Sequence, residues 1–102
     1  MRLPFVAEAA DDLWEAAAWY EGRRSGYGSL LVAEVMQVAE RAAQLPLSGA
    51  PVRDMDPARD VRRFLVRRFP YSVITAIVND ERAIVAVAHG RRDPGYWHER
   101  LR

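Results

Sequence analysis

The chain has 102 residues, half of them hydrophobic, and a formal net charge of only +1. That length favours a single domain over residues 1–102, with one small two-layer core. The absence of cysteine excludes disulfides and thiolate metal sites, and no stretch approaches the roughly 20 apolar residues that a membrane span needs.

Residues 2–6 are short, apolar and interrupted by Pro4, which is typical of an edge strand or the entry to one. The sequence then turns acidic, so the apolar part is too short for a signal peptide, and we expect a cytoplasmic protein. Across residues 7–22, apolar side chains recur at spacings of three and four, which predicts a helix. Carboxylates crowd its early turns, where they favour the positive end of a helix. They are Glu8, Asp11, Asp12 and Glu15.

A second apolar stripe has the same helical spacing. Its members are Leu31, Val35, Val38, Ala42 and Leu45. Glu34 falls on the opposite, polar side. Pro46 ends the helix, because proline disfavours helical geometry in the residue before it. A short glycine-containing turn at residues 25–28 separates the two helices, so we expect an antiparallel hairpin.

Residues 46–60 contain three prolines and no sustained period, which predicts a loop. Three strands are predicted after it, at residues 61–69, 71–79 and 82–89, with a tight polar turn that pairs the last two antiparallel. Both alternating sets of side chains in these last two strands are largely apolar. In the final strand they are Ala83, Val85 and Val87 on one face, and Ile84, Ala86 and Ala88 on the other.

Such strands need cover on both faces of the sheet, because a sheet with one solvated face alternates apolar and polar residues. The helical hairpin covers one face. Either the Tyr96-Trp97 segment or a partner protein covers part of the other. The predicted fold is therefore α+β: an N-terminal strand, an antiparallel helical hairpin, a three-stranded antiparallel sheet and a short C-terminal segment.

The near-neutral net charge hides a strong asymmetry along the chain. From Val61 onward there are nine arginines against four acidic residues, a net charge of +5, whereas the preceding part carries −4. All fifteen basic residues are arginine, whose planar fork suits phosphate and carboxylate groups. The C-terminal part is therefore expected to meet an anionic partner, either a nucleic acid or an acidic protein segment.

Groups able to act on a phosphodiester are predicted to gather at the strand ends. They are Arg62, Arg63, Arg67, Arg68, His89, Arg91, Arg92, Tyr96 and His98. A ribonuclease that uses the 2′-hydroxyl needs proton transfer and cations for the phosphate. His89 or Tyr96 could move protons, and Arg91 or Arg92 could hold the phosphate. Alternatively, His89 is a hydrogen-bonding residue at a strand end, and Tyr96-Trp97 is a packing anchor.

The pattern does not favour a metal site or a nucleotide cofactor. The only two histidines, His89 and His98, are nine residues apart, and no carboxylates cluster with them. No glycine-rich phosphate loop follows a strand. We therefore expect neither a metal nor a cofactor.

The order of elements, with VRRFLVRRFPYSVITAIV and then IVAVAHGRRDPGYWHER, resembles toxins of the RelE/ParE superfamily, the toxic halves of bacterial type II toxin-antitoxin pairs. The resemblance covers nearly the whole chain, including the aromatic end of the first helix at Trp19-Tyr20. It implies a helical hairpin packed on an antiparallel sheet. It also implies a cognate antitoxin as partner, in a toxin-antitoxin hetero-oligomer.

The superfamily contains two activities. RelE-like members cut messenger RNA in the ribosome, with an arginine early in the middle hairpin strand and a C-terminal basic and tyrosine set. Here Pro70-Tyr71 occupies that arginine position, although Arg67 and Arg68 lie just before it. ParE-like members inhibit DNA gyrase without that set, and the chain resembles them more.

A ParE-like inhibitor of gyrase is therefore the leading hypothesis. A metal-independent endonuclease acting on ribosome-bound mRNA and a non-toxic antitoxin-binding member are the alternatives, so enzymatic activity stays open. The residues for a nuclease would be Arg67, Arg68, His89, Arg91 and Tyr96. The residues expected to bind partners are Arg62, Arg63, Arg91, Arg92, Tyr96 and Trp97.

Overall fold

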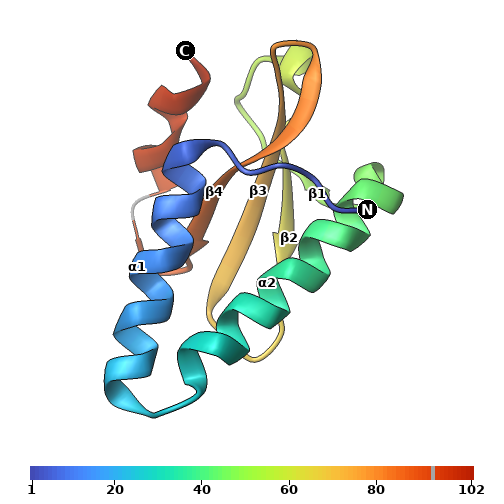
Figure 1. The fold of residues 1–102 in the computed structure, drawn as a ribbon. Helices are drawn as coiled ribbons and strands as arrows, with labels where there is room; N and C mark the ends of the chain where they lie inside the picture. Colours follow the sequence, from blue (N-terminus) through green and yellow to red (C-terminus); the bar gives the residue numbers. More distant parts are fainter. Residues whose placement is uncertain (93) are drawn as a thin grey trace.

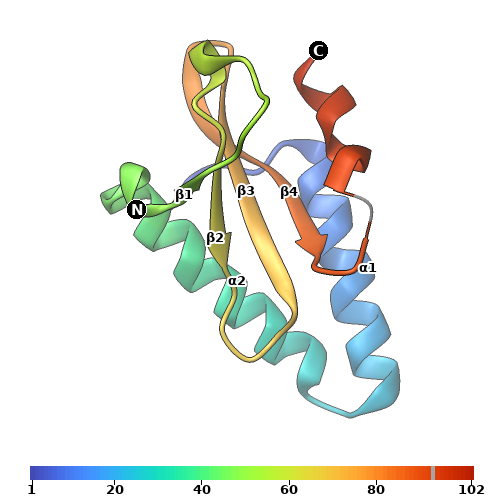
Figure 2. The same ribbon diagram turned by 180° about the vertical axis from the view of Figure 1, so that it is seen from behind.

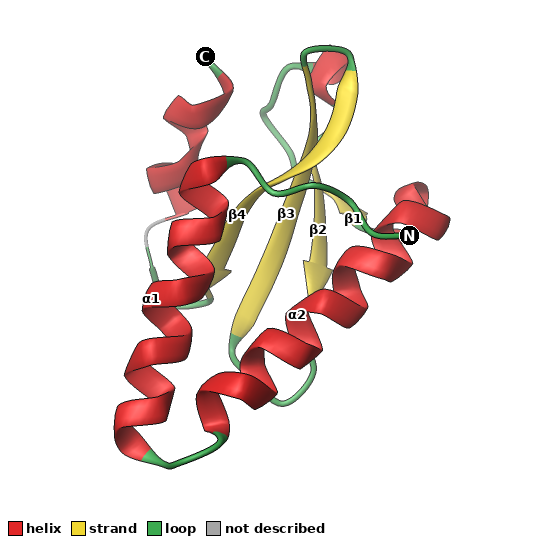
Figure 3. Cartoon of the chain, viewed as in Figure 1, coloured by secondary structure: helices red, strands yellow, loops and turns green. Residues whose placement is uncertain are grey.

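The computed structural model describes residues 1–92 and 94–102. A helical hairpin lies on one face of a four-stranded antiparallel sheet (Figure 1). The α+β class and the predicted order of hairpin, sheet and C-terminal segment are confirmed (Figure 3). Within the described residues, no helix is long and apolar enough to cross a membrane.

The hairpin consists of α1 (Ala7–Arg23) and α2 (Tyr27–Gln44), joined by a turn in which Gly26 has a φ of 91°. A side chain at Gly28 would place its Cβ 2.5 Å from the Ala17 carbonyl oxygen, so glycine there lets the helices approach closely. The buried side chains of α1 include Ala9, Leu13 and Ala16, whereas Trp14 is 58% exposed. The helical spacing is confirmed at Leu13 and Ala17, which are both buried, but Trp14 beside them is not part of the core face.

The buried stripe of α2 follows the prediction up to Ala42, but Leu45 lies beyond the end of the helix and is exposed. The expected solvent position of Glu34 is wrong, because its side chain is buried. The turn between two strands brings the Arg68 Nε to 4.0 Å from the Glu34 carboxylate, which places a cation beside it.

The sheet has the order β1 (Ala50–Pro51), β2 (Arg62–Leu65), β3 (Tyr71–Val78) and β4 (Glu81–His89). The predicted loop over residues 46–60 contains β1, whose two residues pair with Arg63 and Arg62 of β2. It also contains two short 3-10 helices, Pro46–Ser48 and Pro57–Arg59. β2 is shorter than predicted, because the chain turns after Leu65 and Arg68 takes a positive φ of 70°.

The predicted N-terminal strand is reduced to a single parallel bridge between Phe5 and Ile84 of β4. The carbonyl of Pro4 accepts a bond from the Ile84 N–H, and the Val6 N–H donates to the Ile84 carbonyl. Pro4 has no N–H to extend the ladder, and α1 begins at Ala7. The segment therefore crosses β4 rather than following it.

The predicted alternation of β4 is wrong in its middle, because the β3–β4 register shifts between Ile74 and Thr75. Ile84 and Val87 both pack in the core beneath the helices, while Val85 and Ala86 pack on the far face. One extra residue in a strand reverses the facing of the side chains that follow it.

The far face of the sheet is partly covered by η3 (Pro94–Leu101), a 3-10 helix (Figure 2). Trp97 is 1% exposed and packs with Leu101 in a second apolar cluster against Ile74 and Val85. The predicted cover by the C-terminal segment is confirmed. This segment places Arg100 beside Asp12 of α1 and Val85 of β4.

Candidate functional site

A buried carboxylate on α1 organises the C-terminal end of β4. Asp12 accepts a hydrogen bond from the Val87 N–H at 3.0 Å. Arg100 of η3 donates to both of its oxygens, at 2.7 and 3.0 Å, and also to the Val85 carbonyl at 2.9 Å. One carboxylate thus joins α1, β4 and η3.

Tyr96 is the second member of this network. Its hydroxyl lies 3.3 Å from both the Asp12 carboxylate and the Val87 carbonyl oxygen. Burial, with the nearby charge of Asp12, raises the pKa of Tyr96 to about 12. The Arg92 guanidinium lies 3.7 Å from the centre of the Tyr96 ring, in a cation–π contact. Tyr96 therefore carries Arg92 on its ring while its neutral hydroxyl faces inward.

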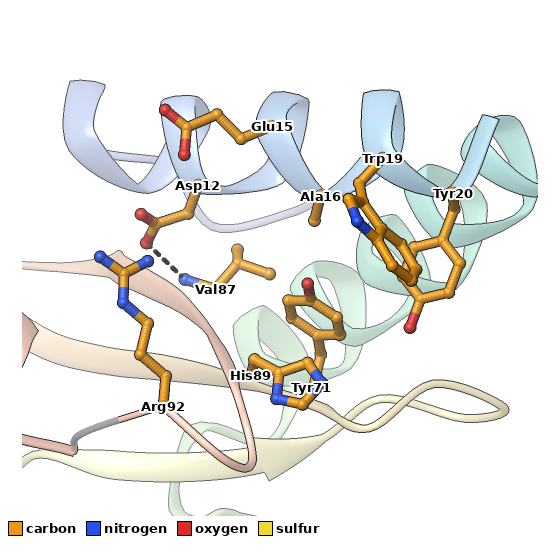
Figure 4. A pocket seen from close by; sticks show the side chains of 9 residues that line it. All are labelled: Asp12, Glu15, Ala16, Trp19, Tyr20, Tyr71, Val87, His89 and Arg92. Atoms are coloured by element: carbon orange, nitrogen blue, oxygen red, sulfur yellow. Dashed lines mark hydrogen bonds between the residues drawn. The ribbon is translucent and has the colours of Figure 1, made fainter. Parts of the chain in front are cut away.

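A cavity of about 280 Å³ lies between α1 and the ends of β3 and β4. Figure 4 shows side chains of α1 facing Tyr71, His89 and Arg92 across it. Its lining consists of Asp12, Glu15, Ala16, Trp19, Tyr20, Tyr71, Val87, His89 and Arg92. Burial raises the pKa of Tyr71, so this phenol is neutral near pH 7. The cavity is thus an aromatic pocket with carboxylates on the α1 side and Arg92 and the His89 ring on the other side.

His89 is held in place at the end of β4. Its Nδ1 accepts a hydrogen bond from the Arg91 N–H at 3.0 Å, and its ring stands edge-on to Tyr71 at 5.1 Å between centroids. Accepting at Nδ1 leaves Nε2 as the donor of the neutral ring.

A second concavity of about 190 Å³ lies on the sheet side of the same residues. Its lining consists of Arg63, Ser72, Ile74, Ala88, His89, Gly90, Arg92 and Trp97. His89 and Arg92 therefore form the wall between two hollows. The first contains carboxylates. The second contains no acidic side chain within the part of the chain that the structure describes.

Arg62 is used within the fold. Its Nε donates to the Asp60 carboxylate at 3.0 Å, and its NH1 group donates to the Leu47 and Gly49 carbonyls. Arg82 binds the same carboxylate at 2.6 Å. The hydrogen bond from Arg82, with that from Arg62, lowers the pKa of Asp60. These contacts attach the 46–60 segment to β2 and β4.

The remaining predicted residues are spread around the strand ends. Arg67 and Arg68 lie in the β2–β3 turn, and Arg91 follows β4; none of the three lines either hollow. Arg68 faces Glu34, while Arg67 and Arg91 are exposed. Trp97 is buried and forms part of the floor of the second hollow. The structure thus brings together Arg63, His89, Arg92 and Trp97.

Four exposed arginines around the strand ends form a surface that we call the arginine rim. They are Arg63, Arg67, Arg91 and Arg92. Among the described residues, no carboxylate lies within ion-pair distance of Arg63, Arg67, Arg91 or Arg92. Nor do the described residues contain a group of three histidines, cysteines or carboxylates placed to hold a metal ion. The arrangement can bind anions and apolar groups.

Sequence reasoning missed the two residues at the centre of the network, Asp12 and Arg100. In the sequence alone, Asp12 is one of four carboxylates in the early turns of a helix, and Arg100 is one of nine arginines from Val61 onward. They are 88 positions apart in the sequence. Local periodicity carries no signal for such a pairing.

Comparisons with known proteins agree with this architecture. The model of a family described as the ParE toxin of the type II toxin-antitoxin system parDE matches residues 5–94. A solved structure described as the chromosomal ParDE TA system from P. aeruginosa has a TM-score of 0.70 and 21% sequence identity, covering 87% of this chain and 95% of that chain. At that identity the likeness shows the fold. No curated protein matches the sequence.

Proposed function

The chain belongs to the family of ParE toxins of type II toxin-antitoxin systems, and we propose that it acts by inhibiting DNA gyrase and is neutralised by a cognate antitoxin. The two proteins form a hetero-oligomer in the cytoplasm. Inhibition of gyrase requires binding rather than chemistry on RNA. We favour it over RNA cleavage because of the positions and bonding of the residues that a nuclease would use.

The observation that carries the proposal is the environment of Tyr96. A general acid or base works best with a pKa near the operating pH. The pKa of Tyr96 is raised to about 12, and its hydroxyl faces Asp12 and the Val87 carbonyl. A phenol bonded to two internal acceptors supports neighbouring side chains, and a pKa of about 12 matches it poorly to proton transfer near pH 7.

The positions of the other candidate nuclease residues support the same conclusion. His89 lines both hollows, but Arg67, Arg68 and Arg91 line neither. Arg68 lies beside the buried Glu34 carboxylate. Phosphoryl transfer needs the cation and the proton carrier at the same phosphate. The named nuclease set therefore does not assemble at one phosphate, because His89 is its one member that lines a hollow and Tyr96 is bonded inward.

The outer edge of β2 is the proposed contact for the antitoxin. β1 pairs with Arg62 and Arg63, and it has no register partner for Phe64 or Leu65. Leu65 is 72% exposed, and with Leu45 it lines a groove of about 460 Å³. An open strand edge beside exposed leucines accepts an extended apolar segment through main-chain hydrogen bonds.

The charges around this groove indicate the chemistry of that segment. Arg41 and Arg63 both line it. Its described lining contains no acidic side chain. An antitoxin arm with apolar residues for Leu45 and Leu65 and a carboxylate for Arg63 fits both features. The same arm covers part of the arginine rim and so blocks the surface that reaches gyrase.

The direct test is a supercoiling assay with purified gyrase, run beside a translation reaction that reports cleavage of mRNA. We expect the toxin to inhibit supercoiling, to leave the message intact, and to lose its effect when antitoxin is added. Cleavage of message with unaffected supercoiling would assign the nuclease function instead. Binding of antitoxin with no effect in either reaction would assign a non-toxic member.

The arginine rim offers a matched comparison in these assays. The double variant Arg91→Ala/Arg92→Ala removes two adjacent exposed arginines at the end of β4. The pair Arg23→Ala/Arg24→Ala removes the same charge at the end of α1, where both side chains are also exposed. Loss of inhibition in the first variant alone places the gyrase contact at the rim. Equal loss of inhibition in both double variants would mean that the net charge of the toxin, and not the position of the arginines, determines the effect.

A further inference from the structure

The hollow on the sheet side of His89 is lined by cationic and hydroxyl groups from separate elements. Arg63 comes from β2, Ser72 from β3, His89 from the end of β4 and Arg92 from the segment after it. From this convergence we infer that the hollow is an anion subsite, which binds one tetrahedral phosphate group through Arg63, His89 and Arg92. The inference does not rest on the proposed function, although Arg63 and Arg92 also belong to the proposed antitoxin and gyrase contacts.

The charge balance of the hollow supports an anionic ligand. The cavity on the other side of His89 and Arg92 contains Asp12 and Glu15, whereas this hollow has no carboxylate in its described lining. Arg63 and Arg92 both border this hollow, and an anion between two guanidinium groups relieves their mutual repulsion. Charge-assisted hydrogen bonds from arginine to phosphate are among the stronger ones in proteins.

Two of the three donors, Arg92 and His89, are also held before a ligand arrives. Arg92 stacks 3.7 Å from the Tyr96 ring, and Tyr96 is fixed in turn by Asp12 and Val87. The His89 ring is oriented by the bond from the Arg91 N–H. Ordering flexible side chains reduces affinity, so prior positioning favours binding.

The shape of the hollow selects a small ligand. Its volume is about 190 Å³, smaller than the 280 Å³ of the cavity on the other side of His89. Ile74, Ala88 and Trp97 contribute its apolar part. Donors from three separate elements approach from different directions, which suits the oxygens of a tetrahedral group better than those of a planar carboxylate. Nucleic acid and free phosphate both supply that group.

The test is a titration of the labelled full-length protein, followed through the arginine Nε–H and histidine ring signals at constant ionic strength. The probes are inorganic phosphate, a deoxythymidine oligonucleotide and acetate. We expect phosphate to give saturable shifts at Arg63, His89 and Arg92. Arg63→Ala and Arg92→Ala should each weaken its binding at least about tenfold. Arg102→Ala, an equal loss of charge at an exposed position, should not.

The outcomes separate the sources and the alternatives. Binding of phosphate and of the oligonucleotide at these residues supports the subsite, with nucleic acid as the source; binding of phosphate alone supports it with a free phosphate. Acetate bound as tightly as phosphate would overturn the inference in favour of an acidic protein group. Absence of saturable shifts, or equal weakening in Arg102→Ala, would also overturn it. Unchanged backbone spectra of the variants check that each one folds.

Discussion

Asp12 and Arg100 form a two-point ion pair, with N–O distances of 2.7 and 3.0 Å, that ties the last helical segment of the chain to its first helix. Both side chains are shielded from water, at 7% and 16% exposure. The pair is therefore more than a surface contact, because a buried charge needs its partner. It also determines where Tyr96 and Arg92 lie.

Replacing Asp12 by Asn should destabilise the fold by about 3 kcal/mol, because Arg100 is left shielded without its counter-ion. Urea unfolding measures the free energy. The neighbouring Asp11→Asn is the control, since Asp11 is exposed and should change stability by no more than about 0.5 kcal/mol. Similar small effects in both variants would mean that η3 is held by apolar packing alone.

Tyr96→Phe keeps the ring beneath Arg92 and removes only the hydroxyl. We expect toxicity to be retained, because the phenol does not transfer protons in the proposed mechanism. Growth after induction of the gene measures this. A nuclease that used Tyr96 as acid or base would instead lose activity roughly 10²- to 10⁴-fold. Such a loss would favour the mRNA endonuclease over the gyrase inhibitor.

The double variant Arg91→Ala/Arg92→Ala should abolish toxicity with a loss of stability of about 1 kcal/mol, since exposed arginines contribute little to folding beyond the Arg92–Tyr96 contact. Cell growth and thermal unfolding give the two readouts. If the double variant failed to fold, the rim would be structural rather than a binding surface.

Stability should fall in acid partly through Asp60. Hydrogen bonds from Arg82 and Arg62 lower its folded pKa, below an unfolded value of about 3.9. The stabilisation is fully present above the unfolded pKa and is lost as the pH falls toward and through the folded pKa. The free energy of unfolding of Asp60→Asn should therefore decline less than that of the wild type between about pH 7 and pH 3. Urea unfolding at each pH measures it. Asp80→Asn, at an exposed turn, should keep the wild-type dependence.

Leu65→Lys should weaken neutralisation while leaving toxicity intact. The change places a charge at the open edge of β2, where an apolar antitoxin segment is proposed to lie. Co-expression with the cognate antitoxin measures rescue of growth. Leu47→Lys is the control, because Leu47 is 63% exposed but does not line the groove. Full rescue of Leu65→Lys would place the antitoxin elsewhere.

The helices could be predicted from the sequence because each has one buried stripe with an unbroken period. Leu13 on α1 and Val35 on α2 are both at the core positions that the spacing indicates. The sheet was predicted less completely. Two residues are too short a run for β1 to produce a pattern, and the shift between Ile74 and Thr75 is invisible to a rule based on alternation.

The arginine rim could be anticipated from the charge of the C-terminal part, but the contacts of each arginine could not. Arg62 and Arg63 are neighbours in the sequence, yet Arg62 is bonded to Asp60, whereas Arg63 lines the hollow on the sheet side of His89 and the groove beside Leu65. That difference depends on which face of β2 each side chain occupies and on the 46–60 segment. Contacts between distant segments decided it.

The pairing of Asp12 with Arg100 also has a consequence for synthesis. A ribosome makes α1 first and η3 last, so a nascent chain holds the Asp12 carboxylate without its cation until Arg100 has left the exit tunnel. Trp97 and Leu101, which complete the far apolar cluster, emerge at the same late stage. A translation product that stops short of them lacks both the cation of the Asp12 pair and part of the far apolar cluster, so this end of the molecule forms only when synthesis reaches Leu101.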